Sequence, residues 1–126
     1  MDKFAMIIFG ASGDLTKRKL MPALYSLFRE KRLTGDFHIL GIGRTIYSDE
    51  DYRSYISGEL RTFVKSEEQD VALMEAFISH LYYLPMDPAK EEGYAMLRQR
   101  LVELTNEVDP DNLLFYLHFT VLFPCI

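Results

Sequence analysis

The sequence predicts an α/β domain in which helices cover both faces of a parallel sheet. Short apolar runs alternate with amphipathic helical patterns along the chain. The first apolar run, residues 4–9, is continuous, which is typical of a central strand that is buried on both faces. A turn with two glycines, residues 10–13, follows this run and precedes a helical pattern. Strand, glycine turn and helix in this order form the phosphate-binding unit of Rossmann-like dinucleotide domains.

Composition limits the class of protein. The chain has 126 residues, of which 48% are hydrophobic and 13% aromatic, enough for one domain with a substantial core. Its net charge of −5 argues against nucleic acid as a partner. Its single cysteine, Cys125, cannot form an internal disulfide, and no stretch approaches the ~20 apolar residues of a membrane span. We therefore expect a cytoplasmic protein without membrane or nucleic-acid partners.

The glycine turn departs from the standard dinucleotide pattern. Gly10 can turn sharply, and Gly13 allows backbone N–H groups to approach a phosphate. A helix that opens near Asp14 would direct its positive end at the anion. However, Ser12 occupies the middle glycine position of G-x-G-x-x-G, and the last glycine is also replaced. The pattern alone is therefore a weak signal of dinucleotide binding.

A basic cluster of Lys17, Arg18 and Lys19 follows the turn. Cations at a helix N-terminus oppose the helix dipole by about 0.3 to 1 kcal/mol each. A bound anion would offset this repulsion, so the cluster favours an anion site. The alternative is a solvated basic turn at the surface.

The first helix contains a proline. Apolar residues recur with helical spacing at Leu20, Leu24, Leu27 and Phe28. Pro22 lies inside this pattern, and proline is tolerated only in the first turn of a helix. We expect a short helical turn through Lys19 and a main helix that restarts near Met21.

The second strand, residues 37–42, ends at Arg44. At this position a dinucleotide domain specific for NAD carries an acidic residue, which binds the 2′-hydroxyl of the adenosine ribose. Arginine suits the 2′-phosphate of NADP, because its planar guanidinium binds phosphate with two hydrogen bonds. A surface salt bridge to Asp49 or Glu50 explains Arg44 equally well from spacing alone.

The remaining pattern completes the sheet. It predicts connecting helices that begin at Ser48 and Ser66, a third strand at 80–84, a helix through 94–104 and a fourth strand at 112–117. Aromatic residues in the connecting helices are interpreted as core. Right-handed crossovers predict the strand order 3-2-1-4, with the binding site at the carboxyl ends of the strands.

Three segments together resemble the N-terminal part of glucose-6-phosphate dehydrogenase. They are Gly10 to Leu20 with Pro22, then Gly41-Ile42-Gly43-Arg44, and Asn112 to Leu117. The resemblance covers residues 4–117, and the G-x-x-G-D-L-[AT]-K-x-K run is distinctive of that family. It implies NADP as cofactor and glucose 6-phosphate as substrate. The reaction it implies is oxidation to 6-phosphogluconolactone in the pentose phosphate pathway. For the full-length family it also implies an oligomer.

The resemblance also assigns residues to the site. It implies that Arg44 holds the 2′-phosphate and that Lys19 lies between substrate and cofactor. The dinucleotide loop would comprise Gly10, Ala11, Ser12, Gly13, Asp14 and Leu15.

Other family features are missing. The E-K-P and R-x-D-H-Y-L-G-K segments of the family, the second with its catalytic histidine, do not occur, and the surroundings of His38, His80 and His118 do not match. The tail, residues 118–126, departs from the small, proline-rich loop of the family. We therefore expect residues 1–126 to be a truncated NADP-binding domain with no catalytic residue and no metal, inactive alone. The alternatives are a self-standing NADP-binding or scaffold protein without catalysis, and another Rossmann-type enzyme such as a reductase.

Overall fold

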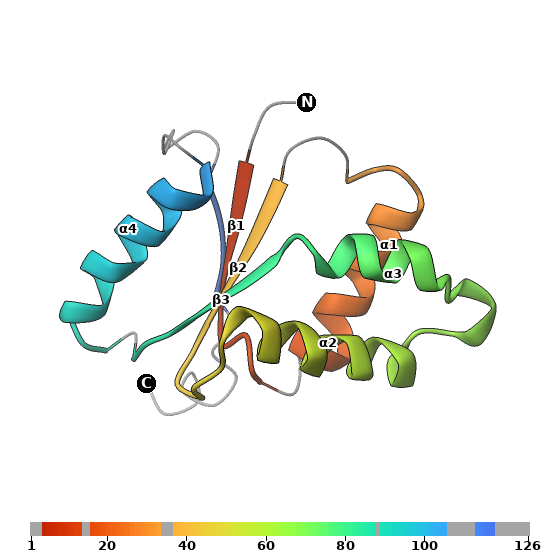
Figure 1. The fold of residues 1–126 in the computed structure, drawn as a ribbon, viewed down its shortest axis with the longest axis horizontal. Coiled ribbons are helices and arrows are strands. Elements are labelled where there is room, and N and C mark those ends of the chain that lie inside the picture. Colours follow the sequence, from red (N-terminus) through yellow and green to blue (C-terminus); the bar gives the residue numbers. More distant parts are fainter. Residues whose placement is uncertain (1–3, 14–15, 34–36, 88, 106–112, 118–126) are drawn as a thin grey trace.

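The computed structural model describes residues 4–13, 16–33, 37–87, 89–105 and 113–117 (Figure 1). Within them, strands β1 (Phe4–Phe9), β2 (Phe37–Gly43), β3 (Leu81–Pro85) and β4 (Leu113–Leu117) form one sheet. All pairings are parallel, and the order is β3-β2-β1-β4, as the sequence predicts. No helix in these ranges is long and apolar enough to cross a membrane.

Helices cover both faces of this sheet (Figure 1). Helices α1 (Met21–Arg29), α2 (Asp49–Phe63) and α3 (Val71–Ile78) lie on one face, and α4 (Glu92–Thr105) lies on the other. Alternation along β1 supplies both cores, because successive side chains of a strand point to opposite faces. Ile8 packs into the core beneath α1, α2 and α3, whereas Ile7 packs with Leu97 and Leu101 of α4.

The first helix restarts at the proline, as predicted. A π-helical turn, η1 (Thr16–Leu20), leads directly into α1, and Pro22 lies in the first turn of α1. The missing N–H of Pro22 costs little there, since the first N–H groups of a helix have no intrahelical acceptor.

The start of α2 at Ser48 is confirmed, because the Ser48 side chain accepts a hydrogen bond from the Asp51 N–H at 3.0 Å. The helix start at Ser66 is wrong. A short 3-10 turn, η2 (Ser66–Glu68), occupies that position, and α3 begins after Asp70, whose side chain caps it. The Gln69 side chain explains the break, since its amide donates to the carbonyl oxygens of Arg61 and Val64. Strand β3 begins at Leu81 rather than at His80.

Two glycines provide a matched test of packing. A Cβ on Gly41 would lie 2.6 Å from the Ala11 Cβ and 3.3 Å from the Tyr52 ring, whereas a Cβ on Gly58 would meet nothing within 4 Å. We predict that Gly41→Ala lowers the free energy of unfolding by about 1 to 3 kcal/mol, because neither neighbour can move. Gly58→Ala, inside α2, should raise it by about 0.5 to 1 kcal/mol. Urea titration measures both, and equal stability of the two variants would contradict this account.

Candidate dinucleotide-binding site

The glycine loop is attached to the carboxyl end of β2. Gly10 has a φ of 80°, a left-handed conformation that favours glycine. The N–H groups of Gly10 and Ala11 both donate to the carbonyl oxygen of Ile42, at 2.9 and 3.0 Å. Because β1 and β2 are parallel, these bonds hold the loop at the edge of the sheet where the carboxyl ends of both strands meet.

The loop is also closed on itself. The Gly10 carbonyl oxygen accepts one hydrogen bond from the Gly13 N–H and one from the Thr16 hydroxyl, both at 2.9 Å. Thr16 is buried at the start of η1. A Cβ on Gly13 would lie 3.1 Å from that same carbonyl oxygen, so the turn leaves little room for a side chain.

Tyr52 of α2 forms a hydrogen bond with the backbone of the loop. Its hydroxyl donates to the Ala11 carbonyl oxygen at 2.9 Å, and its side chain is completely buried. Burial raises the pKa of Tyr52 far above its ordinary value, and the neighbouring Tyr83 adds to the rise. The phenol therefore stays protonated and remains a hydrogen-bond donor at neutral pH.

Arg44 lies at the tip of β2 and is largely exposed. The exposed fraction of its side chain is 78%, and its Nε lies 3.8 Å from Asp87 Oδ1. Arg44 thus forms a surface ion pair, but with Asp87 rather than with Asp49 or Glu50. Asp49 instead pairs with Arg100 of α4 and accepts a hydrogen bond from the Tyr83 N–H. Arg44 is thus held by one long, solvent-exposed contact.

The basic cluster is only partly available to an anion. Lys17 Nζ lies 3.5 Å from Glu59 Oε1 and 5.8 Å from the Tyr55 ring, and the guanidinium of Arg18 lies over Phe63. Tyr55 and Glu59 raise the pKa of Lys17. Two members of the cluster thus have partners on α2, which offset part of the repulsion, and the anion site stays a prediction. Lys19 is exposed on η1.

The histidines of the described region lie far from the loop along the strands. His38 is near the start of β2, and His80 immediately precedes β3. The Nδ1 of His80 lies 2.8 Å from the Phe37 carbonyl oxygen, and its ring stacks on the Phe37 ring. Both belong to the amino ends of the strands, opposite the edge that carries the loop. Asp14, Leu15 and His118 lie outside the described residues.

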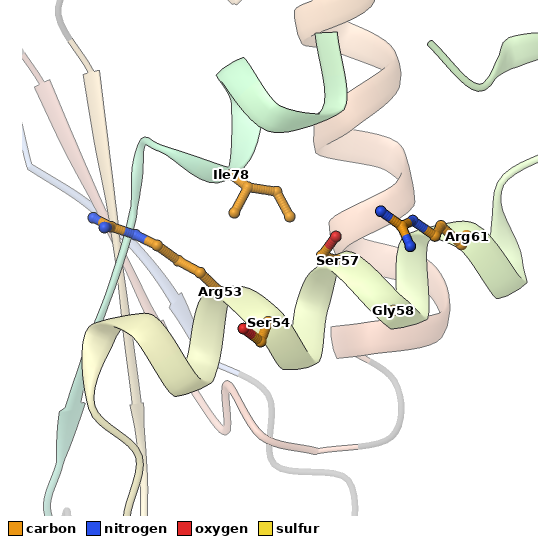
Figure 2. A pocket seen from close by; sticks show the side chains of 6 residues that line it. All are labelled: Arg53, Ser54, Ser57, Gly58, Arg61 and Ile78. Carbon is orange, nitrogen blue, oxygen red and sulfur yellow. The ribbon is translucent and has the colours of Figure 1, made fainter. Parts of the chain in front are cut away.

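One surface cavity of about 370 Å³ lies between α2 and α3 (Figure 2). Its lining residues are Arg53, Ser54, Ser57, Gly58, Arg61 and Ile78. Neither Arg44 nor any residue of the glycine loop lines this cavity. No group of three or more histidine, cysteine or acidic side chains that could hold a metal occurs among the described residues.

Sequence reasoning missed three side chains that shape this site: Thr16, Tyr52 and Tyr83. The pattern of the connecting helices predicts that Tyr52 belongs to the core, and this is correct for its ring. The available signal was their type, because a buried tyrosine hydroxyl requires a hydrogen-bond partner that phenylalanine does not. The sequence could not indicate that the partners would be backbone groups of the loop and of the β2 tip.

Comparison with known proteins identifies the family. Residues 7–123 match the family described as "Glucose-6-phosphate dehydrogenase, NAD binding domain". This match extends beyond Leu117. The departure of residues 118–126 stays a prediction, since they lie outside the described residues.

Two similar curated proteins are glucose-6-phosphate 1-dehydrogenases. The protein from Aggregatibacter actinomycetemcomitans is 43% identical over 113 residues, which are 89% of this chain and 22% of the relative. The protein from Rhizobium meliloti is 38% identical over 103 residues, which are 82% of this chain and 21% of the relative.

A solved glucose-6-phosphate dehydrogenase, described as in complex with its substrate glucose-6-phosphate, superposes with a TM-score of 0.79 and 36% identity. The superposition covers 92% of this chain and 24% of that one. The chain thus spans less than a quarter of these relatives' length. With the sequence match, the shared fold and the glycine loop in agreement, the chain belongs to the family of NAD-binding domains of glucose-6-phosphate dehydrogenase.

Proposed function

We propose that residues 1–126 are an NADP-binding domain that serves the oxidation of glucose 6-phosphate to 6-phosphogluconolactone in the pentose phosphate pathway. The observation that carries this proposal is the attachment of the glycine loop to β2 beside Arg44. The two ends of the adenosine half of NADP, the diphosphate and the 2′-phosphate, require anion-binding groups at these two places.

The loop geometry fits a diphosphate. Gly10, Ala11, Gly13 and Lys17 use their N–H groups within the protein, so a phosphate would meet the N–H of Ser12 and that of Thr16 at the start of η1. We assign the diphosphate to the segment comprising Gly10, Ala11, Ser12, Gly13, Asp14 and Leu15. When bound, the nicotinamide of the cofactor accepts a hydride from the substrate.

Arg44 suits the 2′-phosphate because releasing it costs little. Exposed ion pairs contribute about 0 to 1 kcal/mol, and the 3.8 Å contact with Asp87 is of this kind. A phosphate dianion offers two hydrogen bonds to the guanidinium instead. Lys19, exposed on η1, would face glucose 6-phosphate beside the nicotinamide.

Replacement of Arg44 tests the cofactor preference. We predict that the chain binds NADPH about tenfold or more tightly than NADH, because a charged hydrogen-bonded contact contributes about 1.5 to 3 kcal/mol. Arg44→Ala should weaken NADPH binding and leave NADH binding unchanged, as measured by isothermal titration calorimetry. Arg32→Ala is the matched control, since Arg32 is also exposed and pairs with a carboxylate, Glu30, at 3.5 Å. The same NADPH preference in wild type and Arg44→Ala would refute the role of Arg44.

We further predict that the purified 126-residue chain does not oxidise glucose 6-phosphate. Removal of the hydroxyl proton needs a base about 2.6 to 3.2 Å away, and loss of such a base typically costs about 10²- to 10⁴-fold in rate. His38 and His80 belong to the opposite edge of the sheet. NADPH formation is followed by absorbance, with the enzyme from Aggregatibacter actinomycetemcomitans as positive control. Turnover within about tenfold of that control would show that this chain contains a sufficient base.

A further inference from the structure

The Tyr83 side chain touches the tip of β2, although it comes from the neighbouring strand. Its hydroxyl donates to the Thr45 carbonyl oxygen at 2.6 Å, in the residue that follows Arg44. The backbone of Tyr83 is fixed as well, because its N–H donates to Asp49 Oδ1 at 2.8 Å and β3 pairs with β2.

The same hydroxyl meets the glycine loop. A Cβ on Gly43 would lie 2.7 Å from the Tyr83 hydroxyl oxygen and 2.9 Å from Ser12 Oγ, so the two hydroxyls flank one Cα. The single phenol proton is used on Thr45, so the phenol oxygen can only accept a hydrogen bond from a neighbouring hydroxyl such as that of Ser12. Burial raises the pKa of Tyr83, and the nearby Ser12 hydroxyl opposes the rise.

Aromatic packing prevents the Tyr83 ring from swinging away. It stacks on Tyr52 with ring centroids 4.7 Å apart and meets the edge of Tyr47 at 5.4 Å. Tyr52 itself donates to the Ala11 carbonyl oxygen. The two stacked tyrosines thus lie at two successive residues of the loop: Tyr52 bonds to Ala11, and the hydroxyls of Tyr83 and Ser12 both lie at Gly43.

We propose that Tyr83 is a positioning residue that fixes the glycine loop relative to the tip of β2 and thereby sets the preference for NADP over NAD. This inference rests on the proposed function. NADP would use both anion-binding places at once, and a bridge between Ser12 and Thr45 holds them at one separation. NAD lacks the 2′-phosphate and depends only on the loop. Loosening the bridge should therefore reduce the preference rather than weaken both dinucleotides equally.

Tyr83→Phe in the full chain tests this role, because it keeps the packed ring and removes the hydroxyl that bonds to Thr45 and lies beside Ser12 at Gly43. Tyr25→Phe is the matched control, since Tyr25 is also buried and its hydroxyl donates to a backbone carbonyl oxygen, that of Glu68, at 2.9 Å. We expect the ratio of the NADH and NADPH dissociation constants to fall about three- to tenfold in Tyr83→Phe and to stay unchanged in Tyr25→Phe. A merely structural Tyr83 would leave the ratio at its wild-type value, and that result would overturn the inference.

Hydrogen–deuterium exchange without cofactor gives a second readout. We expect faster amide exchange in both segments 10–13 and 43–47 of Tyr83→Phe, but not of Tyr25→Phe. Unchanged exchange in either segment would overturn the bridge. If Tyr83→Phe does not fold, Ser12→Ala removes only the hydroxyl on the loop side and should accelerate exchange in segment 10–13 but not in segment 43–47, where the bond from Tyr83 to Thr45 remains. If the wild-type chain binds neither dinucleotide, the proposed function is refuted. If the wild-type chain prefers NADPH and Tyr83→Phe keeps the same preference, only the role of Tyr83 is refuted.

Discussion

The carbonyl oxygen of Ile42 accepts hydrogen bonds from two successive N–H groups, those of Gly10 and Ala11, and the arrangement of the site depends on this acceptor. Both donors can reach it because the chain turns at Gly10 with a positive φ. The turn presents the Ala11 carbonyl oxygen to Tyr52 and the Ser12 hydroxyl to Tyr83. Residues from β1, β2, β3 and α2 therefore meet at one edge of the sheet, although the chain reaches them far apart in sequence.

Side chains of α2 cover the free edge of strand β3 and so keep Tyr83 in position. Asp49 accepts from the Tyr83 N–H, and Arg53 Nε donates to the Leu81 carbonyl oxygen at 2.7 Å. The guanidinium groups of Arg53 and Arg100 lie 4.8 and 5.7 Å from the centroid of the intervening Tyr82 ring. Side chains thus satisfy backbone groups that another strand would otherwise pair with. Strand β3 can therefore hold the Tyr83 side chain against the site without offering free backbone groups to a further strand.

The predicted features are those that depend on local pattern. Continuous apolar runs, the serine cap at Ser48 and the proline at the start of α1 each act within a few residues, and right-handed crossovers limit the strand order. The failures involve side chains that bond to a different helix. The Gln69 side chain interrupts the helical pattern before α3 by donating to the carbonyl oxygen of Arg61 in α2. Lys17 forms an ion pair with Glu59, which also belongs to α2. Periodicity gives the face on which a tyrosine lies, but not the backbone oxygen that its hydroxyl meets.

Cofactor selection in such a site depends on how rigidly the exposed arginine is presented. Arg44 has an exposed side chain, with one long contact to Asp87, on a backbone that is held by hydrogen bonds. The Gly43 carbonyl oxygen accepts from the Met86 N–H at 2.9 Å, and the Thr45 carbonyl oxygen accepts from Tyr83. Binding a phosphate would then order only the side chain, at about 0.5 to 1.5 kcal/mol, rather than the side chain and the tip together. If the tip were not held, the cost of ordering its backbone would offset much of the free energy of a bidentate contact, since each residue fixed costs about 1 to 2 kcal/mol. In the proposed function, discrimination between the dinucleotides would therefore depend on a buried tyrosine that need not touch the 2′-phosphate.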